Sequence, residues 1–224
     1  MTRIWTILLA GALLAPVANA ADWVDLLRNG LDGWTVLGDG IWRLRSDGVI
    51  TAYRGPDERL FTDRESVSAQ EYKRWDTRQS WLYTKKEYEE FDLHLEYWVR
   101  TPGNSGISIR DPSQAEWGIS DPPDFSKTPS KLGYEIQINS EWPDRWGTGS
   151  LYGLAKAKEG LQHVGEWNSL NIESRVDAIR VYVNSVLAAE HPGDPKRPTK
   201  GPIGLQLHDQ HSVVMFRNIS ILER

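Results

Sequence analysis

The sequence contains no cysteine. Without thiols the protein can form no disulfide, has no cysteine nucleophile and cannot bind zinc through thiolates. A lipid anchor on a cysteine near the N-terminus is excluded for the same reason. Packing, rather than covalent cross-links, must therefore stabilise the folded chain.

Long apolar runs are missing beyond the N-terminal region. The chain opens with Arg3, continues with the apolar run Ile4–Val17 and then reads Ala18-Asn19-Ala20. This order is typical of a secretory signal peptide, and the run is shorter than the roughly 20 residues that a spanning helix needs. We therefore expect residues 1–20 to be a signal peptide and residues 21–224 to be an exported protein, periplasmic or extracellular, with no membrane span.

The sequence also has no excess of positive charge. It has 26 Lys and Arg residues against 31 Asp and Glu residues, a formal net charge of −5, and the basic residues are scattered along the chain. This balance gives no electrostatic reason to expect nucleic acid or an anionic membrane as a partner. No sequence feature indicates the oligomeric state.

Helical periodicity is absent after the first 20 residues, whereas alternation of apolar and polar residues recurs throughout. Many short strands separated by Gly, Pro and Asn predict one all-β domain, a two-sheet antiparallel jelly-roll sandwich of the concanavalin A-like lectin/glucanase type. The segment Asp22–Leu27 could form a short helix. The predicted strands are Trp34–Leu37, Ile41–Arg45, Gly48–Ala52, Ser80–Thr84, Phe91–Arg100, Gly106–Arg110, Gly133–Ile138, Ser150–Gly153, Ser169–Ser174, Ala178–Asn184, Val186–Glu190, Ile203–His208 and Val213–Leu222.

Tryptophan, in contrast, is abundant, with 11 residues. Trp142 and Trp146 both lie in the long connection Asn139–Thr148. Long connections without regular structure are often functional, and indole rings on loops can hold the apolar face of a sugar. We therefore expect Trp142 and Trp146 at the rim of a carbohydrate site.

Four predicted strands carry hydrogen-bonding side chains on the face that points away from the core, because side chains alternate along a strand. These residue types suit hydrogen bonds to hydroxyl groups and proton transfer. We expect the four strands to be neighbours in one sheet and to form the floor of a groove. The outward residues are Asp92, His94, Glu96 and Trp98; Ser108 and Arg110; Glu135 and Gln137; and Gly204, Gln206 and His208.

Six motifs occur in the order and spacing of the 3-keto-disaccharide hydrolase domain family, which this chain resembles from about Trp23 to Leu222. The resemblance implies the same sandwich fold, export, and cleavage of glycosides whose glucose unit has been oxidised at C3. It also implies that Arg110, Glu135, Gln137 and His208 line the site. The motifs are Asn104-Ser-Gly-Ile-Ser-Ile-Arg110, Gly133-Tyr-Glu-Ile-Gln-Ile138, Thr148-Gly-Ser-Leu-Tyr-Gly153, Gly165-Glu-Trp-Asn168, Gly201-Pro-Ile-Gly-Leu-Gln-Leu-His208 and Phe216-Arg-Asn-Ile219.

The chain departs from the family pattern at two places. Asn139 stands where many relatives have Asp, and Asn184-Ser185 replaces an Asn-Gly turn. A conventional retaining glycosidase needs two carboxylates about 5–5.5 Å apart. The strand here reads Glu135-x-Gln137-x-Asn139-x-Glu141, in which amides interrupt the carboxylates. This pattern disfavours a retaining mechanism.

Cleavage of a 3-keto sugar does not require this pair of carboxylates. The carbonyl acidifies the hydrogen on C2 and permits elimination of the C1 substituent followed by addition of water. We expect Glu135 or His208 to be the base, the other to be the acid, and Arg110 to stabilise the enolate. Gln137 and Gln206 would orient hydroxyl groups. The expected substrate-binding set is Gln137, Gln206, Trp142, Trp146, Tyr152, Glu96 and Trp98.

A divalent metal ion is a further possibility, because His94, Glu96, Glu135 and His208 could converge and a bound ion would stabilise the enolate. No compact metal-binding motif occurs in the sequence. The alternative to a 3-keto-glycoside hydrolase is a lectin-like module that binds carbohydrate without chemistry, since the sandwich fold alone does not fix the function. A second alternative is a conventional glycosidase.

Overall fold

The computed structural model describes residues 22–54, 79–114, 116, 124–141, 145–209 and 211–224. The expected signal peptide lies outside the described residues, as does Trp142. Among the helices described, none is long and apolar enough to cross a membrane.

The chain forms two antiparallel β-sheets, which confirms the predicted sandwich. One has eight strands in the order β11-β10-β9-β6-β13-β4-β3, with β1 also paired to β13, and the other has five in the order β2-β5-β12-β7-β8. The strands are β1 Val24–Asp25, β2 Trp34–Leu37, β3 Ile41–Leu44, β4 Ile50–Tyr53, β5 Ser80–Tyr88, β6 Phe91–Val99, β7 Gly103–Ile109, β8 Tyr134–Ser140, β9 Asn168–Arg175, β10 Ala178–Val183, β11 Val186–His191, β12 Gly201–Leu207 and β13 Val214–Glu223.

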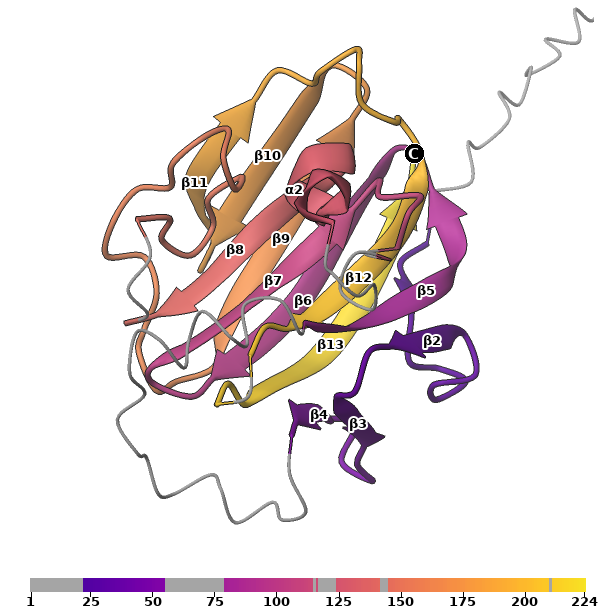
Figure 1. Ribbon diagram of the computed structural model, residues 1–224, viewed down its shortest axis with the longest axis vertical. Helices are drawn as coiled ribbons and strands as arrows, with labels where there is room; N and C mark the ends of the chain where they lie inside the picture. Colours follow the sequence, from indigo (N-terminus) through magenta and orange to yellow (C-terminus); the bar gives the residue numbers. More distant parts are fainter. Residues whose placement is uncertain (1–21, 55–78, 115, 117–123, 142–144, 210) are drawn as a thin grey trace, which may run out of the picture.

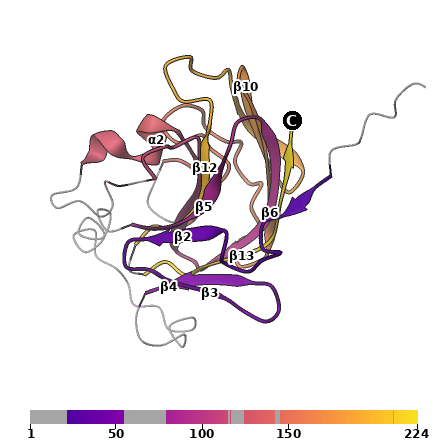
Figure 2. The same cartoon turned by 90° about the vertical axis from the view of Figure 1, so that its right-hand side faces the viewer.

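The two sheets lie face to face, with β5 and β12 in one layer and β6 and β13 in the other (Figure 2). Their facing side chains form the core, which includes Leu93, Leu95 and Tyr97 of β6 and Ile136 of β8, all 0% exposed. Burying these apolar side chains is the main force that stabilises a domain without disulfides. The alternation of apolar and polar residues in the sequence therefore predicted correctly which side chains point into the core.

Two local predictions are wrong. Asp22–Leu27 is not a helix, because Val24 and Asp25 pair with β13 as a short strand and the N–H of Leu26 donates to Ile219 O. Ser150–Gly153 is not a strand either; only Leu151 bridges, to Ile136 and to Ala155. In both segments tertiary pairing decides the backbone conformation, which local patterns do not encode.

The expectation that four polar strands share one sheet is correct for three of them. β7, β8 and β12 belong to the five-stranded sheet, but β6 lies in the eight-stranded sheet behind it (Figure 1). The short helix α2, Pro129–Leu132, and the 3₁₀ turn η3, Phe125–Lys127, lie on the outer side of the five-stranded sheet, where Figures 1 and 2 agree. On this side α2 lies against β7 and β8.

Candidate active site on the five-stranded sheet

Two rows of side chains cross the outer face of the five-stranded sheet. In the first row Tyr83 of β5 pairs with Gly204 of β12, Gly204 with Ser108 of β7, and Ser108 with Glu135 of β8. Residues directly opposite each other on antiparallel strands place their side chains on the same face. The first row therefore places a carboxylate and two hydroxyl groups on one surface.

The second row is one step further along the strands. Trp81 pairs with Gln206, and Gly106 pairs with Gln137. The Trp81–Gln206 pair lies next to the Gly106–Gln137 pair, because a Cβ on Gly106 would be 3.2 Å from Gln206 Oε1. This row supplies amide groups beside the carboxylate of the first row.

Each row contains a glycine over which a neighbouring side chain lies. A Cβ on Gly204 would come within 2.4 Å of Tyr83 Cε1, and a Cβ on Gly106 would be 3.1 Å from Glu135 Oε1. Because a glycine has no side chain, the tyrosine ring and the carboxylate can lie flat against the sheet. The two glycines bring together groups from strands that are not neighbours.

The carboxylate of Glu135 is held by a chain of hydrogen bonds. Gln206 Nε2 donates to Glu135 Oε1 and to Gln79 Oε1, both at 3.0 Å, and Trp81 Nε1 donates to Gln79 Oε1 at 3.2 Å. Glu135 is 8% exposed and Gln206 is 0% exposed. Hydrogen bonds that pass through buried groups fix their positions, so the carboxylate has a defined orientation.

Tyr83 lies beside a second carboxylate. Its hydroxyl group donates to Asp111 Oδ2 at 3.4 Å, while Asp111 Oδ1 accepts from both the N–H and the O–H of Ser113. Burial, followed by the negative charges of Asp111 and Glu135, raises the pKa of Tyr83 well above its ordinary value, although a hydrogen bond with Ser108 acts in the opposite direction. The phenol therefore stays protonated and acts as a hydrogen-bond donor.

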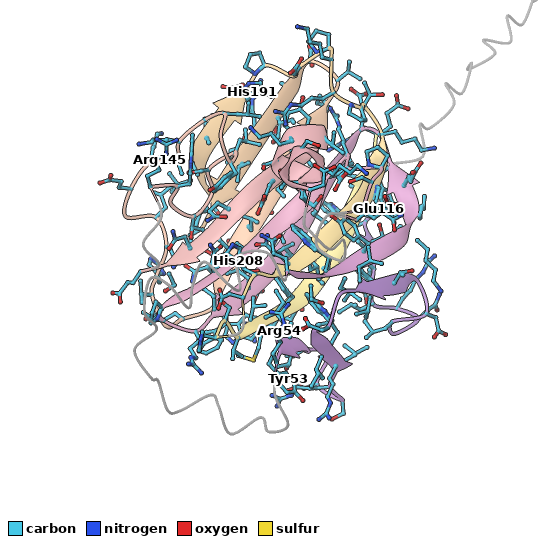
Figure 3. The ribbon with its side chains drawn as sticks, viewed as in Figure 1. Tyr53, Arg54, Glu116, Arg145, His191 and His208 are labelled. Carbon is cyan, nitrogen blue, oxygen red and sulfur yellow. The ribbon has the colours of Figure 1, made fainter. Side chains whose placement is uncertain are left out.

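His208 follows the last residue of β12 and is held by its neighbour Asp209. His208 Nδ1 lies 3.2 Å from Asp209 Oδ2, and Ser212 Oγ donates to the same oxygen at 2.6 Å. Arg54 Nη1 donates to the backbone oxygen of Asp209, and Figure 3 shows Arg54 and His208 toward the same end of the molecule. The imidazole thus has a fixed orientation.

Asp209 is ionised in this arrangement. Burial raises the pKa of its carboxyl group, but the hydrogen bond and positive charge of His208 lower it, as do the hydrogen bonds from Ser212 and from the N–H of His211. The balance leaves the pKa of Asp209 below its ordinary value. A carboxylate at this distance stabilises the positively charged form of the imidazole.

Arg110 does not join this cluster, so the prediction that it points outward beside Glu135 and His208 is wrong. Its backbone has φ 57°, which breaks the alternation of the strand at its end. The side chain is buried, donates from Nη2 to Glu89 O and interacts with the inward-facing Tyr134. The left-handed turn therefore directs the guanidinium group away from the outer face.

Glu96 and Trp98 are also separated from the cluster, because both lie on β6 in the other sheet. Glu96 pairs with Arg217 at 2.6 Å, and Trp98 Nε1 donates to Gly165 O at 3.0 Å. His94 Nδ1 lies 2.8 Å from Asn171 Oδ1 on the same sheet. The set considered for a metal ion therefore does not converge, and the described residues contain no group of three or more His, Cys, Asp or Glu positioned to bind one.

Trp146 and Tyr152 belong to the segment that follows β8 and returns along its outer edge. Their ring centroids are 5.6 Å apart, and the N–H of Tyr152 donates to Glu135 O at 2.8 Å. Asn139 Nδ2 donates to Trp146 O at 3.2 Å, which an aspartate could not do. Asn139, the departure from the family pattern, therefore fixes the loop that carries Trp146.

Sequence reasoning missed Tyr83, Trp81, Gln79, Asp111 and Asp209. The alternation of Ser80-Trp-Leu-Tyr-Thr84 places Trp81 and Tyr83 on one face. However, nothing in the sequence distinguishes outward aromatic residues from core residues. Asp111 and Asp209 each lie two positions past the end of a strand, where alternation no longer applies.

A comparison with models of protein families shows which family the chain belongs to. The model of the 3-keto-alpha-glucoside-1,2-lyase-like domain matches residues 22–222, almost the whole described chain. The chain belongs to this family. This result confirms the resemblance drawn from the six motifs, and Glu135, Gln137, Gln206 and His208 lie within the matched 3-keto-alpha-glucoside-1,2-lyase-like domain. A search of curated proteins finds no match.

Solved structures of low sequence identity share the fold of this 3-keto-alpha-glucoside-1,2-lyase-like domain. A candidate glycosyl hydrolase from Parabacteroides distasonis is 23% identical, with 91% of this chain and 100% of that chain covered and a TM-score of 0.64. A second from the same organism is 21% identical, with 90% and 94% covered and a TM-score of 0.61. The carbohydrate-binding module CBM66 from Bacillus subtilis is 15% identical, with 85% and 96% covered and a TM-score of 0.53.

Proposed function

We propose that the protein is an exported enzyme that cleaves the glycosidic bond of 3-keto-glycosides by elimination and hydration. Membership of the 3-keto-alpha-glucoside-1,2-lyase-like family supports a carbohydrate-active role. The observation that carries the proposal is the Glu135 carboxylate, fixed by Gln206 on the strand that ends at the His208–Asp209 pair. Binding a sugar requires hydrogen bonds only, whereas an oriented carboxylate near an oriented imidazole can also move protons.

In this mechanism Glu135 is the base and His208 is the acid. Glu135 removes the proton from C2, whose acidity comes from the carbonyl at C3. The C1–O bond then breaks, and His208 donates a proton to the departing oxygen. We assign the acid role to His208 because the ionised Asp209 stabilises its protonated form. Water adds across the resulting C1–C2 double bond to give the hydrated sugar.

Gln206 and Gln137 supply hydrogen bonds to sugar hydroxyl groups. We place the sugar ring over Gln206, which binds the base Glu135 and lies two residues before the acid His208 at the end of β12. Trp146 and Tyr152 border the same side of β8 as Glu135 and present aromatic rings to the substrate. Arg110, Glu96 and Trp98 have no part in this mechanism.

The test is turnover of a chromogenic 3-keto-glucoside by the purified protein. Glu135→Gln and His208→Ala should each lower kcat by about 10²-fold or more, the usual contribution of a general acid or base. The matched controls are Glu87→Gln and His163→Ala, whose side chains are exposed and belong to neither row. Rates near the wild-type value in both site variants would disprove the assignment.

A panel of ordinary and oxidised disaccharides distinguishes the other functions. Binding without turnover of any sugar would indicate the lectin-like module. Turnover of unoxidised disaccharides at a similar rate would indicate a conventional glycosidase. Asp111 is the one observation in favour of the glycosidase, because it places a second carboxylate beside Tyr83. In that case Asp111→Asn should abolish activity together with Glu135→Gln.

A further inference from the structure

The position of Arg110 leaves the carbonyl oxygen of the substrate without an assigned hydrogen-bond donor. As the base removes the C2 proton, negative charge develops on this oxygen, and donors oriented toward it lower the barrier. The first row of the outer face contains two hydroxyl groups, those of Tyr83 and Ser108. Both lie on the row that ends at Glu135.

The geometry brings these two hydroxyl groups together. A Cβ on Gly204 would meet three atoms of the Tyr83 ring, Cε1, Cζ and Cδ1, at 2.4, 2.7 and 2.9 Å. The ring therefore extends across Gly204 toward β7, where Ser108 is the residue opposite Gly204. Neighbouring strands are about 4.8 Å apart, and a tyrosine side chain spans this distance. Beyond Ser108 the next residue in the row is Glu135.

A second observation points to a ligand at this place. Gln206 Oε1 is buried and has no hydrogen-bond partner, although Gln206 is 0% exposed, whereas the Ser108 hydroxyl group is hydrogen-bonded to Tyr83. Buried polar atoms without a partner are rare in folded proteins and call for an explanation. Gln206 Oε1 and Glu135 Oε1 both lie beside Gly106, 3.2 and 3.1 Å from the position of a Cβ there. A sugar hydroxyl group bound at this place would satisfy Gln206 Oε1.

We propose that the hydroxyl groups of Tyr83 and Ser108 bind the C3 carbonyl oxygen of the substrate. The proposal rests on the proposed function and assigns the group that replaces Arg110. When Glu135 takes the C2 proton, the electron pair of the C2–H bond forms a C2–C3 double bond and the carbonyl pair moves to the oxygen. For this step the Tyr83 hydroxyl group turns from Asp111 Oδ2, which lies 3.4 Å away, to the substrate oxygen. Tyr83 and Ser108 then donate to that oxygen until the pair returns and the C1–O bond breaks.

Gln206 complements this pair. Its Nε2 is bound by Glu135 and Gln79, so only Oε1 remains for the ligand. A carbonyl oxygen cannot donate to Oε1, but the hydroxyl group on the neighbouring C2 can. The site therefore recognises an acceptor at C3 and a donor at C2, which is the pattern of a 3-keto-glucose unit.

The experiment compares Tyr83→Phe and Ser108→Ala with Tyr88→Phe. Tyr88 is a tyrosine of the same strand that packs in the core between the sheets, so it controls for the loss of a tyrosine hydroxyl group elsewhere on β5. Turnover of a 3-keto-glucoside gives kcat and KM, and calorimetry gives binding of the same sugar in a Glu135→Gln background. Thermal unfolding checks that all variants are folded.

We expect kcat to fall by about 10²-fold in Tyr83→Phe and in Ser108→Ala, as for the loss of one oxyanion donor, with little change in Tyr88→Phe. Binding should weaken about 5- to 10-fold in the two site variants. If the wild type cleaves the sugar and both site variants keep its kcat, this inference is overturned and the proposed function stands.

If the wild type binds the 3-keto-glucoside without cleaving it, the proposed function fails and the binding data decide the inference. Selective weakening in Tyr83→Phe and Ser108→Ala would still support a site for the carbonyl oxygen. Binding equal to that of Tyr88→Phe, or no binding by the wild type, would overturn it.

Discussion

At the scale of single residues, Gly204 decides how the outer face of the five-stranded sheet is built. The Tyr83 ring occupies the space that a side chain at position 204 would fill. Cores and covered faces are packed to a density that leaves no room for an added methyl group. The absence of one side chain therefore permits the approach of another from the neighbouring strand.

Gly204→Ala should destabilise the protein by about 1–3 kcal/mol, because the methyl group must displace the Tyr83 ring. Gly33→Ala is the matched control, since nothing lies within 4 Å of a Cβ there and its φ is not positive. Urea unfolding monitored by tryptophan fluorescence gives both free energies. Equal stability of the two variants would show that the ring moves aside without cost.

At the scale of elements, the hairpin of β10 and β11 shows how one turn joins two parts of the fold. Asn184 and Ser185 have φ 49° and 67°, the left-handed pair of a tight hairpin turn. Asn184 Oδ1 accepts from the N–H of Ser169, while Nδ2 donates to Leu161 O and to Asn168 Oδ1. Asn184 therefore fixes β9 and a loop in addition to the turn, whereas Ser185 is exposed.

Ser185→Gly should raise the free energy of unfolding by about 1 kcal/mol, because a left-handed conformation is strained for serine and not for glycine. Asn184→Gly relieves backbone strain in the same way but removes three side-chain hydrogen bonds, so it should lower stability by about 1 kcal/mol or more. Chemical denaturation of the two variants and the wild type measures the contrast. Stabilisation by both substitutions would refute the role assigned to the Asn184 side chain.

At the scale of the whole molecule, ionised carboxylates with lowered pKa values add to the stability that the packed core provides. In Asp92 burial raises the pKa, but hydrogen bonds and charge from Arg175 and Arg224 lower it below the ordinary value. In Glu96 the bonds from Asn218 and Arg217 outweigh burial in the same direction. Asp209 behaves likewise. A carboxyl group with a lowered pKa in the folded state favours folding wherever it is ionised.

The contribution of these carboxyl groups to stability should therefore be lost as the pH drops below about 4. The unfolded carboxyl groups titrate near pH 4, so their contribution is complete above that value and is lost as the pH passes through the lower folded pKa values. Urea unfolding from pH 7 to pH 3 measures the curve. Asp209→Asn should flatten part of the acid loss, and stability that increases below pH 4 would contradict the assignment.

The sequence alone predicted much of the architecture and part of the site. Alternation predicted the inward side chains of β6, β7, β8 and β12 and the outward positions of Glu135, Gln137 and Gln206. This was possible because successive side chains of a strand point to opposite faces, a rule that depends only on neighbouring residues. The motifs gave the family, which the match over residues 22–222 confirms. The roles of Glu135 and His208 remain proposals for the turnover experiments above.

Only the tertiary structure decided which strands are neighbours and which side chains meet. Strand order separates Glu96 and Trp98 from Glu135, and the left-handed turn at Arg110 directs its guanidinium group away. The same order brings Tyr83 across Gly204 to Ser108. A repeat of two residues fixes the face of a side chain within its strand, but the pairing of distant strands depends on the packing of the whole chain.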